Sequence, residues 1–125
     1  MENLDLECAE LGRQLAEIKA DGKPVEDKVF TTALGVLEDQ GPYACFLYLK
    51  AREGDAGRNI TDKAAGFLGR ILGQDNTPRD PLQFMQALAP DLDRLLFARD
   101  LLRHAFVYAR YHAKTREGGR GGAET

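Results

Sequence analysis

Serine is absent from the 125 residues, and cysteine occurs only twice, at Cys8 and Cys45. Without serine the chain cannot use a serine nucleophile. The two cysteines form neither a Cys-x-x-Cys motif nor a metal-ligand spacing, and isolated cysteines in a reducing cytosol are more often small buried hydrophobes. Cys45 lies within the apolar run 44–49. We therefore expect both thiols to be core residues.

A long apolar run is also missing, since none approaches the roughly 20 residues that a membrane-spanning helix requires. The opening residues 1–7 are acidic, whereas a signal peptide begins with basic residues. These absences predict a cytoplasmic protein that makes no membrane contact. The composition, with 43% hydrophobic and 30% charged residues, can support a buried core, and the length suits one domain.

Hydrophobic spacing predicts an all-α fold, a compact bundle of five to six helices, because apolar residues recur every three or four positions and no strand pattern competes. We expect one helical domain over residues 1–116 and a disordered, glycine-rich tail over residues 117–125. The turn signals place the helices at 4–20, 25–40, 42 to about 52, 62–72, 81–88 and 91–116. Residues 55–60 and 74–79 are expected to be loops, with Thr61 and Asp80 as helix caps.

Charge is distributed unevenly along the chain. Residues 1–62 contain 13 acidic and 7 basic side chains, whereas residues 63–125 contain 7 acidic and 10 basic ones, for a net charge of −3. Overall acidity argues against tight autonomous binding to nucleic acid, which depends on clustered Lys and Arg. It leaves room for a local basic face that acts within a larger assembly.

The last predicted helix carries the clearest candidate site. At about 100° per residue, one narrow strip contains four cations, Arg99, Arg103, Arg110 and Lys114. A neighbouring face contains the apolar residues Leu95, Ala98, Leu102, Ala105, Ala109 and Ala113. Phe106 falls between them, at the edge of the strip, where an aromatic ring could stack on an unpaired base. An ordinary solvated face with a few ion pairs explains the same spacing equally well.

No set of residues predicts catalysis, a cofactor or a metal ion. His104 and His112 point in different directions on the last helix and have no carboxylate or thiol placed to complete a metal site. The carboxylates at 38–39, 80, 91 and 93 fall at helix ends or turns, where acids are expected for local reasons. We therefore expect a protein that is not an enzyme.

Two stretches, Val29–Lys50 and Asp93–Lys114, resemble the small subunit of type III-B (Cmr) CRISPR effector complexes. In that family, a helix end containing glycine precedes an apolar helix with a Phe-Leu core, and the chain closes with a long helix that has an aromatic and basic end. The resemblance covers less than half of the chain. Tyr111-His112 stands where the family often has a tryptophan-containing segment, so the alternative within this resemblance is a related type III small subunit.

The resemblance implies a non-catalytic subunit of a cytoplasmic ribonucleoprotein for antiviral defence. Such a subunit contacts the backbone and large subunits, stacks on copies of itself, and helps to hold guide and target RNA. Carried over to this sequence, the phosphate contacts would come from Arg99, Arg103, Arg110 and Lys114, with Lys50 and Arg52 as a second patch. The alternative is a helical protein-interaction module or homo-oligomeric adaptor without nucleic acid, in which the acidic half of one copy meets the basic half of another.

Overall fold

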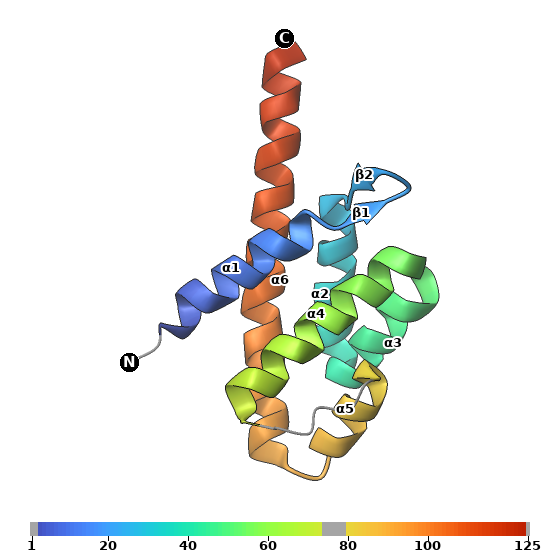
Figure 1. Cartoon of the computed structure of the whole chain (residues 1–125), viewed down its shortest axis with the longest axis vertical. Helices are drawn as coiled ribbons and strands as arrows, with labels where there is room; N and C mark the ends of the chain where they lie inside the picture. The colour runs from blue at the N-terminus through green and yellow to red at the C-terminus, as the bar shows by residue number, and fades with distance from the viewer. Residues whose placement is uncertain (1–2, 74–79, 125) are drawn as a thin grey trace.

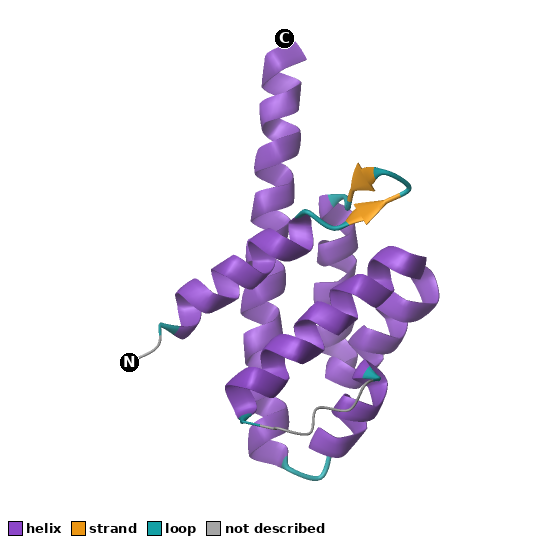
Figure 2. Cartoon of the chain, in the orientation of Figure 1, coloured by secondary structure: helices purple, strands orange, loops and turns teal. Residues whose placement is uncertain are grey.

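Helices form almost all of the computed structural model, which describes residues 3–73 and 80–124 and gives side chains as far as Arg116. Six helices and one short hairpin lie within this part (Figures 1 and 2). Their order is α1 (Leu4–Ala16), β1 (Lys19–Ala20), β2 (Lys23–Pro24), α2 (Asp27–Gln40), α3 (Pro42–Arg52), α4 (Gly54–Leu72), α5 (Pro81–Leu88) and α6 (Leu92–Glu124). The predicted all-α bundle is confirmed.

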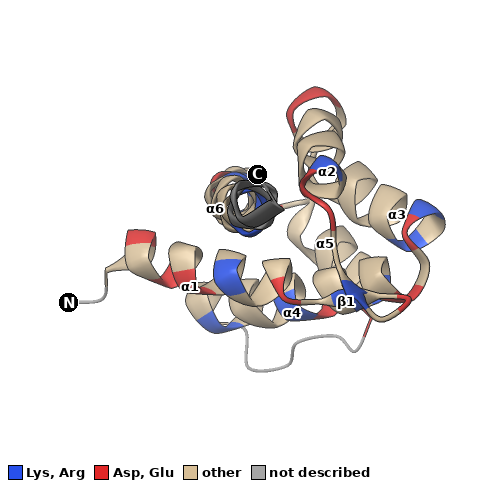
Figure 3. Ribbon diagram, turned by 90° about the horizontal axis from the view of Figure 1, so that it is seen from above, with Lys and Arg blue, Asp and Glu red and all other residues tan. Residues whose placement is uncertain are grey.

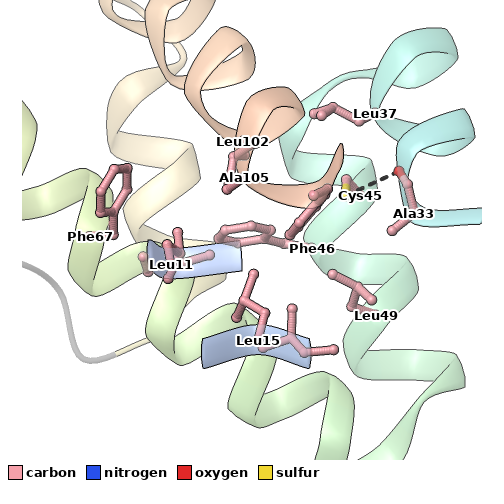
Figure 4. Close-up of a cluster of buried hydrophobic side chains, with 14 of the residues drawn as sticks. Leu11, Leu15, Ala33, Leu37, Cys45, Phe46, Leu49, Phe67, Leu102 and Ala105 are labelled. Carbon is pink, nitrogen blue, oxygen red and sulfur yellow. Dashed lines mark hydrogen bonds between the residues drawn. The ribbon is translucent and has the colours of Figure 1, made fainter. Parts of the chain in front are cut away.

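Phenylalanines from four different helices meet in the core. Phe30 of α2, Phe46 of α3, Phe84 of α5 and Phe106 of α6 are all fully buried. The rings of Phe30 and Phe106 lie 6.3 Å apart between centroids. Leucines of α1 complete the layer beneath Phe46 (Figure 4). Because each of the six described helices contributes at least three buried apolar residues, the bundle is held by one continuous apolar cluster.

Both cysteines lie in this core, as the sequence predicted. The Cys45 thiol donates a hydrogen bond to the Ala33 carbonyl, with a sulfur–oxygen distance of 3.5 Å (Figure 4). Burial raises the pKa of Cys45 to about 12. Burial, and then the nearby carboxylates, raise the pKa of Cys8 to about 11. Both groups are therefore neutral thiols at physiological pH, and neither has thiolate character.

The first helix is shorter than predicted. It ends at Ala16 instead of residue 20, and β1 and β2 form an antiparallel hairpin. Asp21 and Gly22 at its tip have φ values of 54° and 80°. Two consecutive positive φ angles define the turn that favours an Asp-Gly pair between two strands. The Asp-Gly signal thus predicts the hairpin, and reading it only as a helix stop was wrong.

The predicted loop at residues 55–60 is helical, because α4 begins at Gly54, directly after α3. Gly54 has a φ of 59°, which lets the chain turn between the two helices without an intervening loop. Ile60 is fully buried, so the apolar face of α4 starts earlier than the sequence pattern suggested. Thr61 is buried within the helix and donates to the Arg58 carbonyl at 3.0 Å, so it does not cap the helix.

The start of α5 matches the prediction. The Asp80 side chain caps the helix by accepting a hydrogen bond from the Leu82 amide at 3.1 Å, and Pro81 occupies the first position. This bond, together with one from Lys50, lowers the pKa of Asp80. Residues 74–79, predicted as a turn, lie outside the described residues. The last helix continues past its predicted end at residue 116, to Glu124. The disorder expected for residues 117–125 stays a prediction.

Arg116 fastens α6 to the segment around the hairpin. Its guanidinium donates to the Ala16 carbonyl at 2.8 Å and to the Val25 carbonyl at 3.0 Å. We expect Arg116→Ala to lower the free energy of unfolding by about 2 kcal/mol, because two charge-assisted hydrogen bonds to backbone carbonyls are lost. Urea denaturation measures this loss.

Arg94→Ala is the control for this substitution. Arg94 also belongs to α6, but its side chain makes only an exposed ion pair with Asp91 at 3.5 Å. Exposed pairs contribute little, so the control should shift stability by less than about 0.5 kcal/mol. Equal effects of the two substitutions would show that Arg116 does not hold the hairpin.

Candidate nucleic-acid interface

Helix α6 is held between two other helices, which decides which of its sides can reach a ligand. A view down α6 shows α1 running across one side and α2 on another (Figure 3). The α1 crossing is close, because a Cβ at Gly12 would lie 2.6 Å from the Tyr108 Cβ. The α2 contact includes the packed rings of Phe30 and Phe106. The remaining side of α6 stays free of other elements in this view.

The inward face of α6 is the one that the sequence predicted. The sixth of its apolar residues, Leu95, is partly buried. The other five are fully buried: Ala98, Leu102, Ala105, Ala109 and Ala113. The small alanines allow α1 and α2 to approach closely. The predicted strip of cations consequently lies beside the core and along the seam with α2.

Two cations of the strip reach carboxylates of α2. The Lys114 Nζ lies 3.8 Å from the Asp27 Oδ2, and the Arg103 Nε lies 3.9 Å from the Glu38 Oε1. Arg103 also donates to the Asp100 Oδ1 at 2.6 Å, and this hydrogen bond raises its pKa. These two cations are therefore partly neutralised within the chain.

Arg99 and Arg110 complete the strip without a carboxylate partner among the described residues. Arg99 is exposed. Arg110 is half-buried, with its guanidinium carbon 5.7 Å from the centroid of the Tyr111 ring. Its Nε is buried and has no hydrogen-bond partner in the described part of the chain. The strip thus offers two unneutralised cations, one of them supported by an aromatic ring.

The structure does not bring the second patch, Lys50 and Arg52, to the strip. Both residues belong to the last turn of α3, and α2 lies between α3 and α6 in the view down α6 (Figure 3). Lys50 donates to the Asp80 Oδ1 at 3.1 Å and so ties α3 to the start of α5. Arg52 is exposed. A ligand that spans both sets would have to pass over α2.

The expectation that Phe106 borders the strip as a stacking platform is wrong. Its side chain is fully buried and packs on Phe30. On an isolated helix, Phe106 lies between the apolar face and the strip of cations. In the folded protein α2 covers this side of α6, so Phe106 is part of the core. No base can reach this ring in the folded bundle.

Sequence reasoning missed a second feature of α6, its exposed apolar side chains. Leu92, Leu96, Phe97 and Tyr111 are all at least 39% exposed. His104 and His112, for which the sequence predicted no metal site, are exposed as well. The His104 Nε2 lies 3.8 Å from the Asp100 Oδ2. The signal was present in the sequence, because these apolar residues do not fit the inward spacing of residues 98–113.

The described residues of the site are mainly cationic and apolar side chains, with two exposed histidines. No group of three or more His, Cys, Asp or Glu side chains there could hold a metal ion. None of the helices in that part combines the length and the apolar character of a membrane span. Comparisons of the chain with protein-family models, curated proteins and solved structures found no match. The fold and site define an all-α bundle with a mixed basic and apolar terminal helix.

Proposed function

We propose that this chain is a non-catalytic small subunit of a type III CRISPR RNA-guided effector complex and helps to hold guide or target RNA. The observation that carries the proposal is the charge of α6. From Arg103 to Arg116 the sequence contains four Arg or Lys residues and no Asp or Glu. Arg103, Arg110 and Lys114 belong to the strip, whereas Arg116 is bound to the Ala16 and Val25 carbonyls. The helix itself extends past the rest of the bundle (Figure 1).

The ion pairs along the strip do not oppose such a role. Lys114 and Asp27 are 3.8 Å apart, and the Lys114 side chain is 59% exposed. Exposed pairs of this kind contribute at most about 1 kcal/mol, so an RNA phosphate can replace the carboxylate at small cost. Contacts of this type position RNA without reading its sequence. The proposed partners are accordingly the RNA backbone and the neighbouring backbone and large subunits.

A helical interaction module or homo-oligomeric adaptor without nucleic acid is the second candidate. It is favoured by the carboxylate partners of Arg103, Lys114 and Lys50, which reduce the charge available to RNA. The exposed apolar side chains of α6 also suit a protein contact. The two candidates differ in whether RNA accompanies the protein.

Purification of the tagged chain from its native cells separates the two candidates. The proposal expects short guide RNAs and large backbone subunits to co-purify, identified by RNA sequencing and mass spectrometry. Recovery of a homo-oligomer free of RNA would overturn the proposal and leave the adaptor.

The contribution of the strip is tested with Arg99→Ala/Lys114→Ala in the purified complex. For single-stranded RNA, each phosphate contact adds roughly 0.7 to the steepness with which log K falls as log salt concentration rises. Removal of two contacts should therefore reduce the steepness of this slope by about 1.4. Fluorescence anisotropy across a salt series measures it. Lys28→Ala/Lys63→Ala removes the same charge from exposed positions on α2 and α4 and should leave the slope unchanged. Equal slopes for the two double variants would exclude the strip as the RNA contact.

A further inference from the structure

On the exposed side of α6, a tyrosine contacts an arginine of the strip. The Tyr111 side chain is 56% exposed, more than any other Tyr or Phe in the described part of the chain. The guanidinium carbon of Arg110 lies over its ring, 5.7 Å from the ring centroid. Because a cation is attracted to the face of an aromatic ring, this contact holds Tyr111 next to the strip. Unpaired bases of nucleic acids stack on exposed aromatic rings that lie beside cations in this way.

A hollow lies beside the Tyr111 ring, where α1 passes α6 (Figure 3). Its volume is about 350 Å³. One residue of α1 and five of α6 line it: Asp5, Arg103, His104, Val107, Tyr108 and Tyr111. Arg110 does not belong to this lining, so its guanidinium leaves the Tyr111 ring open toward the hollow. Because three of the six side chains have flat rings and Val107 is apolar, the hollow suits a flat ring with few polar groups.

Charged groups on opposite sides of the hollow orient a nucleotide in it. Arg103 belongs to the strip, so a phosphate bound there lies at the edge of the hollow. Asp5 lies on the side of α1 and accepts a hydrogen bond from the Tyr108 phenol at 2.8 Å. A carboxylate repels a phosphate but can accept further hydrogen bonds, such as one from the amino group of a base. The phosphate is therefore expected on the side of the strip and the base on the side of α1.

We propose that this hollow binds one unpaired base of the RNA, stacked on Tyr111, with the amino group of the base donating to Asp5 and its phosphate on Arg103. This base contact rests on the proposed function, since the strip then contacts the RNA backbone. A base within a duplex is already paired and stacked, so the RNA at this site is single-stranded. Tyr111 takes the stacking role that the sequence assigned to Phe106.

Fluorescence anisotropy with the purified full chain and a short cytidine oligonucleotide tests the stacking. Low salt strengthens the phosphate contacts, so the binding of the chain alone is measured there. Tyr111→Ala should weaken binding at least about 5-fold, because stacking on one aromatic ring is lost. Tyr111→Phe keeps the ring and should bind as the wild type does. Tyr43→Ala is the matched control and should have no effect, since Tyr43 is 39% exposed and belongs to α3.

The same titrations separate this base contact from the proposed function. If Arg99→Ala/Lys114→Ala weakens binding and Tyr111→Ala does not, the base contact is overturned and the strip remains the RNA contact. A duplex that binds more tightly than the single strand would also overturn it. If the chain binds neither RNA, the base contact is overturned and the exposed ring is left to a protein contact. The proposed function is then decided by the purification from native cells.

Cytidine and uridine oligonucleotides of equal length test the role of Asp5. Cytosine has an amino group that a carboxylate can accept, whereas uracil has only a ring N–H between two carbonyl oxygens that repel a carboxylate. The wild type should therefore bind the cytidine oligonucleotide about 5-fold more tightly. Asp5→Asn should abolish this preference, because an amide both donates and accepts.

Asp21→Asn is the matched control for Asp5→Asn. It removes the same charge from an exposed position at the tip of the hairpin, and it should keep the preference for cytidine. Equal affinity of the wild type for the two oligonucleotides would overturn the contact of the base with Asp5. Equal loss of the preference in both variants would overturn it as well, because the effect would then come from net charge alone.

Discussion

Replacement of Gly57 by alanine should destabilise the protein by about 3 kcal/mol or more, because the added methyl group has no space. A Cβ at Gly57 would lie 1.8 Å from the Leu49 carbonyl oxygen and 2.9 Å from the Glu53 Cβ. The carbonyl oxygen belongs to the last turn of α3 and accepts the Glu53 amide at 3.0 Å, so it cannot move away cheaply. The first turn of α4 would have to separate from α3. Thermal unfolding should show a fall in Tm of about 10 °C.

Gly66→Ala provides the matched control for Gly57→Ala. Gly66 lies in the same helix, and a Cβ there meets no atom within 4 Å. Alanine has less backbone entropy to lose than glycine, so this substitution should stabilise the protein by about 0.5–1 kcal/mol. The two glycines of one helix are therefore expected to respond with opposite signs. If both substitutions stabilise, the close approach of α3 and α4 is absent in solution.

Replacement of Gly12 by alanine should cost about 2–3 kcal/mol at the crossing of α1 and α6. A Cβ there would lie 2.6 Å from the Tyr108 Cβ and 2.8 Å from the Ala105 carbonyl oxygen. Displacement of α1 would also strain the hydrogen bond that the Tyr108 phenol donates to the Asp5 carboxylate at 2.8 Å. Urea denaturation measures the loss of stability.

Gly35→Ala in α2 is the control for Gly12→Ala, since a Cβ at Gly35 would have no other atom within 4 Å. It should raise the unfolding midpoint slightly. An equal rise with Gly12→Ala would mean that α1 does not pack against α6 as closely as described. The comparison matters for the candidate site, because α1 covers one side of α6 (Figure 3).

Several elements were predictable because local signals and tertiary packing agree there. Gly41 and Pro42 separate α2 from α3, and Asp80 and Pro81 start α5, as the rules for helix ends indicate. The inward alanines of α6 were also identified from their spacing. At these positions the local preference of the residue matches the contact that it makes.

The candidate site was only partly predictable, because side-chain partners come from elsewhere in the chain. The spacing of the cations on α6 was evident, but the approach of Asp27 and Glu38 to Lys114 and Arg103 depends on where α2 packs. The burial of Phe106 has the same cause. A helical projection places residues around one axis and says nothing of the neighbour that covers them.

The amino-acid sequence by itself determined the helical class of this protein, the ends of α2, α3 and α5, and the burial of both cysteines. These properties follow from periodicity, caps and composition, which are local. Tertiary structure decided that residues 55–60 are helical, that Arg116 holds the hairpin, and which side of α6 stays exposed. Those outcomes depend on contacts between segments far apart in the chain, whose free energies outweigh the small local preferences of the residues involved.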